Sequence, residues 1–212
     1  MSGSPLLPDW LRIGWAVLLA ATVVLHTRHA ITMSGQRRWW HAGHSIMAAG
    51  MMLMYALPRL SHPLPYRVGL VVFIVFAVLL VAATSWFAGR EGVVNPLWAA
   101  STADVVVMVY MLAPMSVRTS VLTCLFAGYL GCQVAAWALG LWTRIPLLDR
   151  SAQVAAETNE AGGGGVPDGG GVPDGGCVLE RRVVALTAHS SPTVLASLSL
   201  MAGGMAYMLV AM

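Results

Sequence analysis

Histidine and methionine side chains follow one another at helical spacing within one apolar stretch of the chain. The residues concerned are His41, His44, Met47, Met51 and Met54. Steps of three and four place them on one face of an α-helix, each about one turn beyond the last. Imidazole nitrogen binds several first-row transition metals, whereas thioether sulfur favours Cu(I). The pattern therefore predicts a soft-metal site, with copper as the first candidate.

The methionine spacing occurs at three places in the chain. The three copies are Met47-Met51-Met54, Asp104-Met108-Met111 and Met201-Met205-Met208. Eleven of the thirteen methionines fall in these three apolar stretches. Internal repeats of membrane proteins often place their binding sites at the repeat interface, so we expect the three methionine stripes to converge. The alternative is that the stripes only pack helices together, because methionine fills irregular spaces and the adjacent small residues allow close helix approach.

Two further histidines and one carboxylate join the candidate ligands. His26 and His29 lie three positions apart at the end of the first apolar stretch, a spacing that places both rings on one helix face. Asp104 lies inside an apolar stretch, and a carboxylate at membrane depth is costly enough to mark a candidate site. We expect Asp104 to complete a cation site or pair with a histidine. The alternative is a hydrogen bond to a hydroxyl group in the preceding turn.

The elements that must position these side chains follow from a very apolar composition. Of 212 residues, 58% are hydrophobic and 10% are charged, against about one quarter charged in soluble domains. Several apolar runs reach the ~20 residues with which an α-helix crosses the hydrocarbon layer of a bilayer. We therefore expect an integral membrane protein in contact with lipid. Its three cysteines are too scattered to form a disulfide framework.

Hydropathy divides the chain into six candidate membrane helices. They are residues 10–27, 39–57, 67–88, 96–115, 119–141 and 192–212. The expected fold class is all-α, a polytopic membrane protein whose six transmembrane helices form three tandem helical hairpins. In this division residues 1–142 form a five-helix membrane region and residues 191–212 the sixth helix of the same domain. The glycine- and proline-rich loop 143–190 between them is expected to be disordered.

The distribution of arginine predicts the orientation in the membrane. All twelve basic residues are arginines, and eight of them lie on the side that holds the 143–190 loop. By the positive-inside rule this loop is cytoplasmic and both termini lie outside. The absence of lysine beside abundant alanine, glycine, valine and arginine is typical of a GC-rich bacterial genome, so we expect the plasma membrane of a bacterium. Because the arginines are dispersed at helix ends, we do not expect nucleic acid as a partner.

The histidine and methionine motifs also carry a family resemblance. His44 to Met54 reads HxxMAxGMxxM, and Met201 to Leu209 reads MAxGMAYML. With six short-looped spans, the chain resembles an actinobacterial family of multi-pass membrane proteins of unknown function. The resemblance covers most of the chain except 143–190, whose glycine-rich insertion departs from the family pattern. It implies the same order of histidine then methionine but no established activity, so no residue roles can be transferred.

Three functions remain open on the sequence alone. The first is binding or handling of copper by the histidine and methionine residues. The second is an accessory or structural subunit, without a ligand, that associates with another membrane protein. The third is electron transfer through haem b held between the first two helices, by His26 or His29 opposite His41 or His44. No enzymatic activity is expected, because the chain has no HExxH, GxSxG or Walker-type motif.

Overall fold

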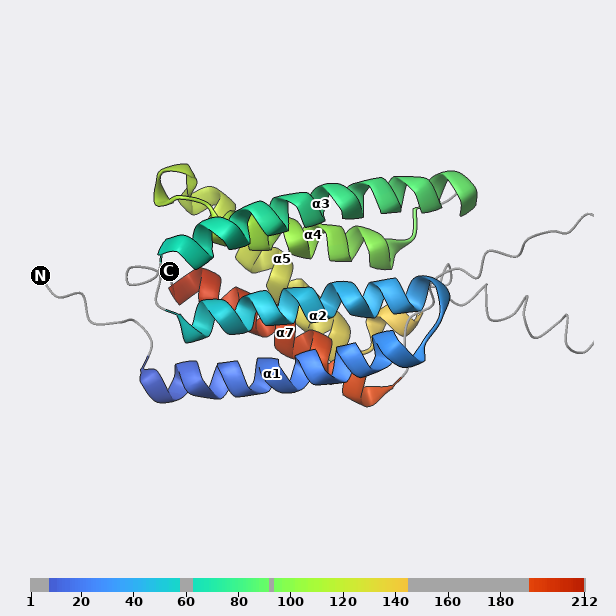
Figure 1. Ribbon diagram of the computed structural model, residues 1–212, viewed down its shortest axis with the longest axis horizontal. Coiled ribbons are helices and arrows are strands. Elements are labelled where there is room, and N and C mark those ends of the chain that lie inside the picture. The colour runs from blue at the N-terminus through green and yellow to red at the C-terminus, as the bar shows by residue number, and fades with distance from the viewer. Residues whose placement is uncertain (1–7, 58–62, 92–93, 145–190, 212) are drawn as a thin grey trace, which may run out of the picture.

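The computed structural model describes residues 8–57, 63–91, 94–144 and 191–211. These residues form six α-helices and two short 3₁₀ helices (Figure 1). The α-helices are α1 Asp9–Thr32, α2 Gly35–Ala56, α3 Pro63–Glu91, α4 Pro96–Leu112, α5 Ser120–Ala138 and α7 Pro192–Ala211, and the 3₁₀ helices are η1 Met115–Val117 and η2 Leu141–Arg144. Each apolar stretch recognised in the sequence thus coincides with an α-helix. Most of the 143–190 loop lies outside the described residues.

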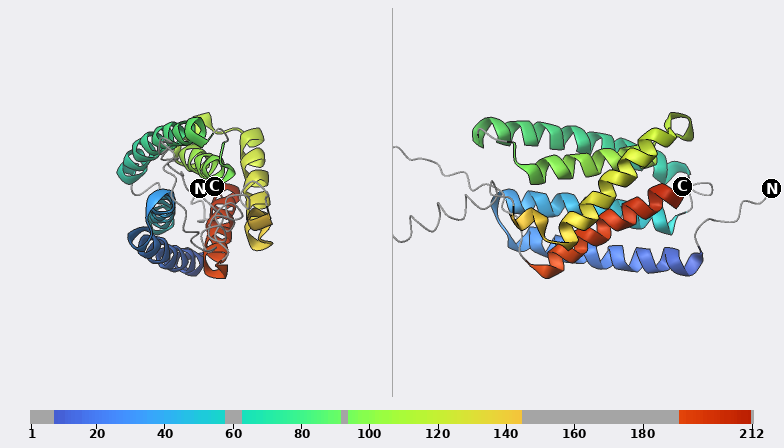
Figure 2. Two further views of the ribbon diagram at one scale, coloured as in Figure 1. Left: turned by 90° about the vertical axis from the view of Figure 1, so that its right-hand side faces the viewer. Right: turned by 180° about the vertical axis from the view of Figure 1, so that it is seen from behind.

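The helices form an inner and an outer set. The inner helices α2, α4 and α7 each contact the other two, while α1 packs mainly on α2, α3 on α4 and α5 on α7. Seen end-on in Figure 2, the outer helices α1, α3 and α5 lie at the periphery. The three helices that carry the methionine stripes therefore meet one another inside the bundle.

Burial separates the two sets in the same way. Each inner helix buries nine or ten residues among those described. The outer helices bury a single narrow line each, namely Leu19-Thr22-His26 on α1, Tyr66-Phe73-Leu80 on α3 and Leu130-Gln133-Trp137 on α5. Their other faces expose large apolar side chains such as Val24, Val78 and Leu125. An apolar surface of this extent is unfavourable in water and suits contact with lipid.

Four of the described helices, α1, α3, α5 and α7, are long and apolar enough to cross a membrane. Helix α4 is apolar but has only 17 residues, because it ends just before Pro114, which disfavours helical backbone in the residue preceding it. Helix α2 is less apolar, since its first turn carries Gln36, Arg37 and Arg38. The expectation of a helical membrane protein is confirmed at this level.

Aromatic side chains from other pairs reach the inner helices at two glycines in equivalent positions of the methionine repeat. A Cβ atom at Gly50 of α2 would lie 2.5 Å from the ring of Phe73 on α3, and one at Gly204 of α7 would lie 3.2 Å from the ring of Trp15 on α1. Tyr129 of α5 makes a comparable contact with α4, where its hydroxyl donates a hydrogen bond to a backbone carbonyl. Each inner helix therefore receives an aromatic side chain from an outer helix that is not its main packing partner. These contacts connect the three pairs around the bundle.

Candidate functional site

All eight methionines of the three stripes are buried. They are Met47, Met51, Met54, Met108, Met111, Met201, Met205 and Met208. The exposed fraction is 0% at Met51 and Met108 and reaches only 9% at Met54. Met52, which is off the stripe, is only half-buried. The methyl carbon of Met108 lies 3.4 Å from the position of a Cβ atom at Gly50, so the α4 stripe reaches the helix that carries the α2 stripe. The stripes face protein, not lipid.

Four histidines form a cluster where the end of α1 meets the beginning of α2. The ring centroids of His26 and His41 are 5.1 Å apart, those of His26 and His44 are 5.4 Å apart, and those of His29 and His41 are 5.0 Å apart. His26, His41 and His44 are at most 3% exposed, and His29 is half-buried. The structure thus brings both histidine pairs of the sequence together. Burial of three imidazoles requires that their polar atoms have hydrogen-bond partners.

The hydrogen bonds of His26 assign the tautomers of two rings. Ser197 of α7 donates its hydroxyl hydrogen to the carbonyl oxygen of Val194 at 2.8 Å, so its oxygen must accept from His26 Nε2 at 3.0 Å. A neutral His26 then carries its lone pair on Nδ1, which accepts from His41 Nδ1 at 2.9 Å. His41 therefore carries its own lone pair on Nε2.

The other two histidines have the same tautomer as His41. His44 Nδ1 donates to the backbone oxygen of Trp40, and His29 Nδ1 donates to that of Leu25, both at 2.9 Å. In the neutral ring the lone pair is again on Nε2. A histidine that binds a metal usually donates its second ring nitrogen to a carbonyl or carboxylate in this way, which fixes the orientation of the ligating nitrogen. His29 and His44 have this arrangement, whereas His41 donates to the imidazole of His26 instead.

Trp40 belongs to the histidine cluster, although an indole is not a metal ligand and the sequence did not mark this residue as part of a site. Its ring centroid lies 4.1 Å from that of His44 and 5.0 Å from that of His41. It is 5% exposed. In the structure it forms an apolar wall around the imidazoles.

Asp104 is buried on α4 and is bound from α5. Tyr129 shares its hydroxyl hydrogen between Asp104 Oδ1 at 3.0 Å and the backbone oxygen of Ala100 at 3.2 Å, and the amide nitrogen of Gln133 donates to the Tyr129 oxygen at 2.7 Å. Both partners were missed by sequence reasoning, since they lie on a helix without methionine or histidine. The carboxylate is 8% exposed. The hydrogen bond between Asp104 and Tyr129 connects α4 to the outer helix α5. Within the described ranges, none of the hydrogen bonds of the histidine cluster involves Asp104.

The chemistry of the donors limits which metal this interior suits. Among the residues that the structure describes, no three His, Cys, Asp or Glu side chains are arranged to hold a metal ion. The usual tetrahedral zinc site, with four nitrogen and thiolate ligands, is therefore not present in the described part of the chain. The donors that are gathered in numbers are thioethers, with imidazole at one end, and this set suits Cu(I).

Comparison of the chain with protein-family models, with curated proteins and with solved structures finds no match.

Proposed function

We propose that this chain is a multi-pass protein of the bacterial plasma membrane that binds Cu(I) between its inner helices. All six α-helices span the bilayer in this proposal, as three tandem hairpins. The 143–190 loop is then cytoplasmic and both termini lie outside, in agreement with the arginine distribution. The actinobacterial resemblance fits the same reading but contributes no residue roles.

One observation carries the proposal: His44 and Met47 are both buried, one turn apart, and the hydrogen bond of His44 to Trp40 leaves its lone pair on Nε2. A buried imidazole with its other nitrogen fixed by a carbonyl is the usual form of a histidine ligand. Met51 continues the same buried face one turn deeper. His44 and Met47 are thus the pair we assign to the entrance of the site.

The arrangement of the remaining donors fits a soft ion that is passed along or stored. The stripes of α4 and α7 add five buried thioethers to the three of α2. Thioethers carry no charge, so a monovalent ion is held without the desolvation cost of a buried carboxylate. His41 and the half-buried His29 continue the donor set beyond His44. We assign to them the delivery of the ion to the pair His44 and Met47.

Haem b is less compatible with the cluster. A haem held between α1 and α2 would need one histidine on each face of the porphyrin. His26 and His41 instead share a direct hydrogen bond of 2.9 Å, which would have to break before a haem entered. An accessory subunit without a ligand is the remaining alternative, and the experiment below distinguishes all three.

The test is metal analysis of the full chain, purified in detergent under reducing conditions after expression with added copper. The key variant changes Met47, Met51 and Met54 to leucine, because leucine conserves volume and keeps the interior packed. The matched control is Met52→Leu, which changes a neighbouring methionine that is off the stripe. We expect stoichiometric copper in the wild type and the control, and loss of copper from the triple variant with its helical circular dichroism unchanged.

A second variant examines the imidazole. His44→Phe should weaken copper binding, and the X-ray absorption spectrum should lose its nitrogen contribution while retaining sulfur. A wild-type protein without copper and without colour would overturn the proposal and leave the accessory subunit. A haem absorption band that disappears with His26→Leu would favour electron transfer instead.

A further inference from the structure

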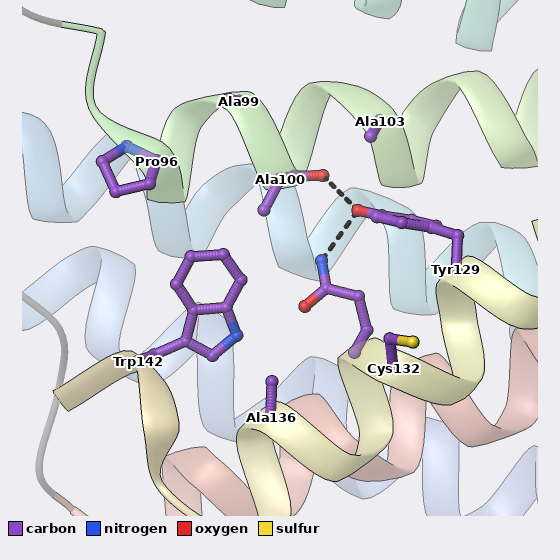
Figure 3. A pocket seen from close by; sticks show the side chains of 9 residues that line it. Pro96, Ala99, Ala100, Ala103, Tyr129, Cys132, Ala136 and Trp142 are labelled. Carbon is purple, nitrogen blue, oxygen red and sulfur yellow. Dashed lines mark hydrogen bonds between the residues drawn. The ribbon is translucent and has the colours of Figure 1, made fainter. Parts of the chain in front are cut away.

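A pocket of about 460 Å³ lies between α4 and α5, apart from the histidine cluster. One wall is the first two turns of α4, with Pro96 and three alanines, and the other is α5 with Tyr129, Gln133 and Ala136. Trp142 of η2 closes one end (Figure 3). The volume is within the range of pockets that bind small molecules, roughly 300–1,000 Å³.

Two buried polar atoms in this lining have no hydrogen-bond partner. Gln133 is 4% exposed, and its amide nitrogen donates a hydrogen bond to the hydroxyl oxygen of Tyr129. Its other amide atom, Oε1, is buried and unpartnered, as is Nε1 of Trp142. The first is an acceptor and the second is a donor. Buried polar groups in native proteins are nearly always satisfied, so this pair indicates a missing partner that both accepts and donates.

A hydroxyl group has this combination. Its oxygen accepts from the indole N–H of Trp142, and its hydrogen is donated to the amide oxygen of Gln133. A carboxylate or phosphate does not fit, because it would place acceptor oxygens against the acceptor oxygen of Gln133. A neutral ligand is also required by the remaining lining, which is mainly alanine and aromatic carbon.

The location of the pocket indicates how such a ligand arrives. Ala99 of α4 and Cys132 of α5 line it and are exposed on the outer surface of the bundle. This surface meets lipid in a membrane, so the ligand enters from the bilayer. The pocket is at the beginning of α4 and the end of α5. Aromatic rings that carry one polar group, such as those of tyrosine and tryptophan, concentrate at the level of a bilayer where membrane helices begin and end.

We propose that this pocket binds a neutral, lipid-soluble phenol, whose ring lies against Trp142 and whose hydroxyl bridges Trp142 and Gln133. The Trp142 indole is held in place by stacking on Trp137, with ring centroids 5.3 Å apart and planes inclined by 28°. The alanine side chains of α4 on the opposite side of the pocket are small and leave space for a flat ring. The proposal does not depend on copper binding, since it uses none of the histidines or methionines.

The probe is 4-fluorophenol, with 4-fluoroanisole as its comparison, added to the full chain in lipid nanodiscs and followed by fluorine NMR. The methyl ether still accepts a hydrogen bond but cannot donate to Gln133. Affinities are expressed per mole fraction in lipid, with empty nanodiscs as the baseline. We expect saturable binding of the phenol, and an affinity for the anisole that is lower by about tenfold or more. The reason is that a site that hydrogen-bonds a hydroxyl discriminates against ligands that lack it.

Three variants determine whether the binding occurs in this pocket. Gln133→Leu should reduce the phenol to the affinity of the anisole, and Ala136→Leu should fill the pocket and abolish saturable binding of both. Ala135→Leu makes the same change at an exposed neighbour outside the lining and should bind as the wild type does. Equal affinity of phenol and anisole for the wild type would overturn the proposal. So would an unchanged phenol preference in folded Gln133→Leu, or unchanged binding in folded Ala136→Leu.

Discussion

His26 on α1 and His41 on α2 are joined by a hydrogen bond of 2.9 Å between their Nδ1 atoms. The second nitrogen of His26 is bonded to Ser197 on α7, 171 positions further along the chain. His26 therefore connects an outer helix to two inner helices, and it does so in an interior where it is fully buried. This residue has a structural role in addition to its place in the cluster.

The first prediction concerns the stability that His26 provides. In His26→Leu the buried Nδ1–H of His41 loses its acceptor, and we expect the free energy of unfolding to fall by about 2 kcal/mol. His29→Leu changes a half-buried histidine on the same helix and should cost clearly less. Unfolding by denaturing detergent, followed by circular dichroism, measures both. Equal losses in the two variants would contradict the central position of His26.

The second prediction concerns the contact between Gly50 and Phe73. In Gly50→Ala the new Cβ atom would lie 2.5 Å from the Phe73 ring, so the ring must move within a packed interior. We expect a loss of about 1–3 kcal/mol in the free energy of unfolding, the usual range for overpacking. Gly204→Ala, with its nearest atom at 3.2 Å, should cost less.

Gly128→Ala is the matched control for these glycines. A Cβ atom at Gly128 meets no atom within 4 Å, so the variant should be neutral or more stable by up to about 1 kcal/mol through helix propensity. Phe73→Ala in combination with Gly50→Ala provides a second comparison. If the Gly50 substitution costs the same with and without the Phe73 ring, contact with this ring is not its cause.

The sequence was sufficient to identify the buried face of each inner helix, because the methionine spacing determines one face. The spacing of Met47, Met51 and Met54 selected buried positions and left out Met52, which is half-buried. Hydrogen bonds between side chains on different helices could not be predicted in this way. The contact of His26 with Ser197 and that of Asp104 with Tyr129 depend on how separate helices are arranged in space, and no pattern within one helix encodes this.

The hydrogen bonds of two arginines were likewise not predictable from the sequence. Arg12 and Arg118 entered the sequence reasoning only as charges that orient the chain in the membrane. In the structure each also binds the C-terminal turn of an inner helix, Arg12 at α2 and Arg118 at the carbonyl oxygen of Met111 on α4. A helix end leaves carbonyl groups without intrahelical partners, and a cation there also interacts favourably with the helix dipole.

The third prediction follows for Arg12. Its Nε atom donates to the carbonyl oxygen of Tyr55 at 3.1 Å, and a terminal nitrogen donates to that of Ala56 at 3.3 Å. Because the guanidinium is partly exposed, we expect Arg12→Ala to lower the free energy of unfolding by only about 1 kcal/mol. Arg12→Lys keeps the charge and should recover part of the loss. Local loosening should appear as faster amide hydrogen exchange in the last turn of α2, and unchanged exchange there would refute the assignment.

The fourth prediction concerns the bond between Tyr129 and Asp104. Tyr129→Phe removes the hydroxyl that donates toward Asp104 and the Ala100 carbonyl and accepts from Gln133, so all three groups lose a partner. We expect a loss of about 2 kcal/mol in the free energy of unfolding. Asp104→Leu removes the other side of the bond. In the Asp104→Leu background the Tyr129 substitution should cost less, because the carboxylate that depended on the hydroxyl is already absent.

The difference between the two backgrounds is the interaction energy of the pair, for which we expect about 1–2 kcal/mol. Tyr110→Phe is the matched control, since its hydroxyl binds Thr119 and Thr123 between α4 and α5 without Asp104. Its cost should be the same in both backgrounds. Additive losses for Tyr129 and Asp104 would mean that the carboxylate is stabilised from elsewhere, and the connection between α4 and α5 would then depend on the backbone bond of Tyr129 to Ala100 instead.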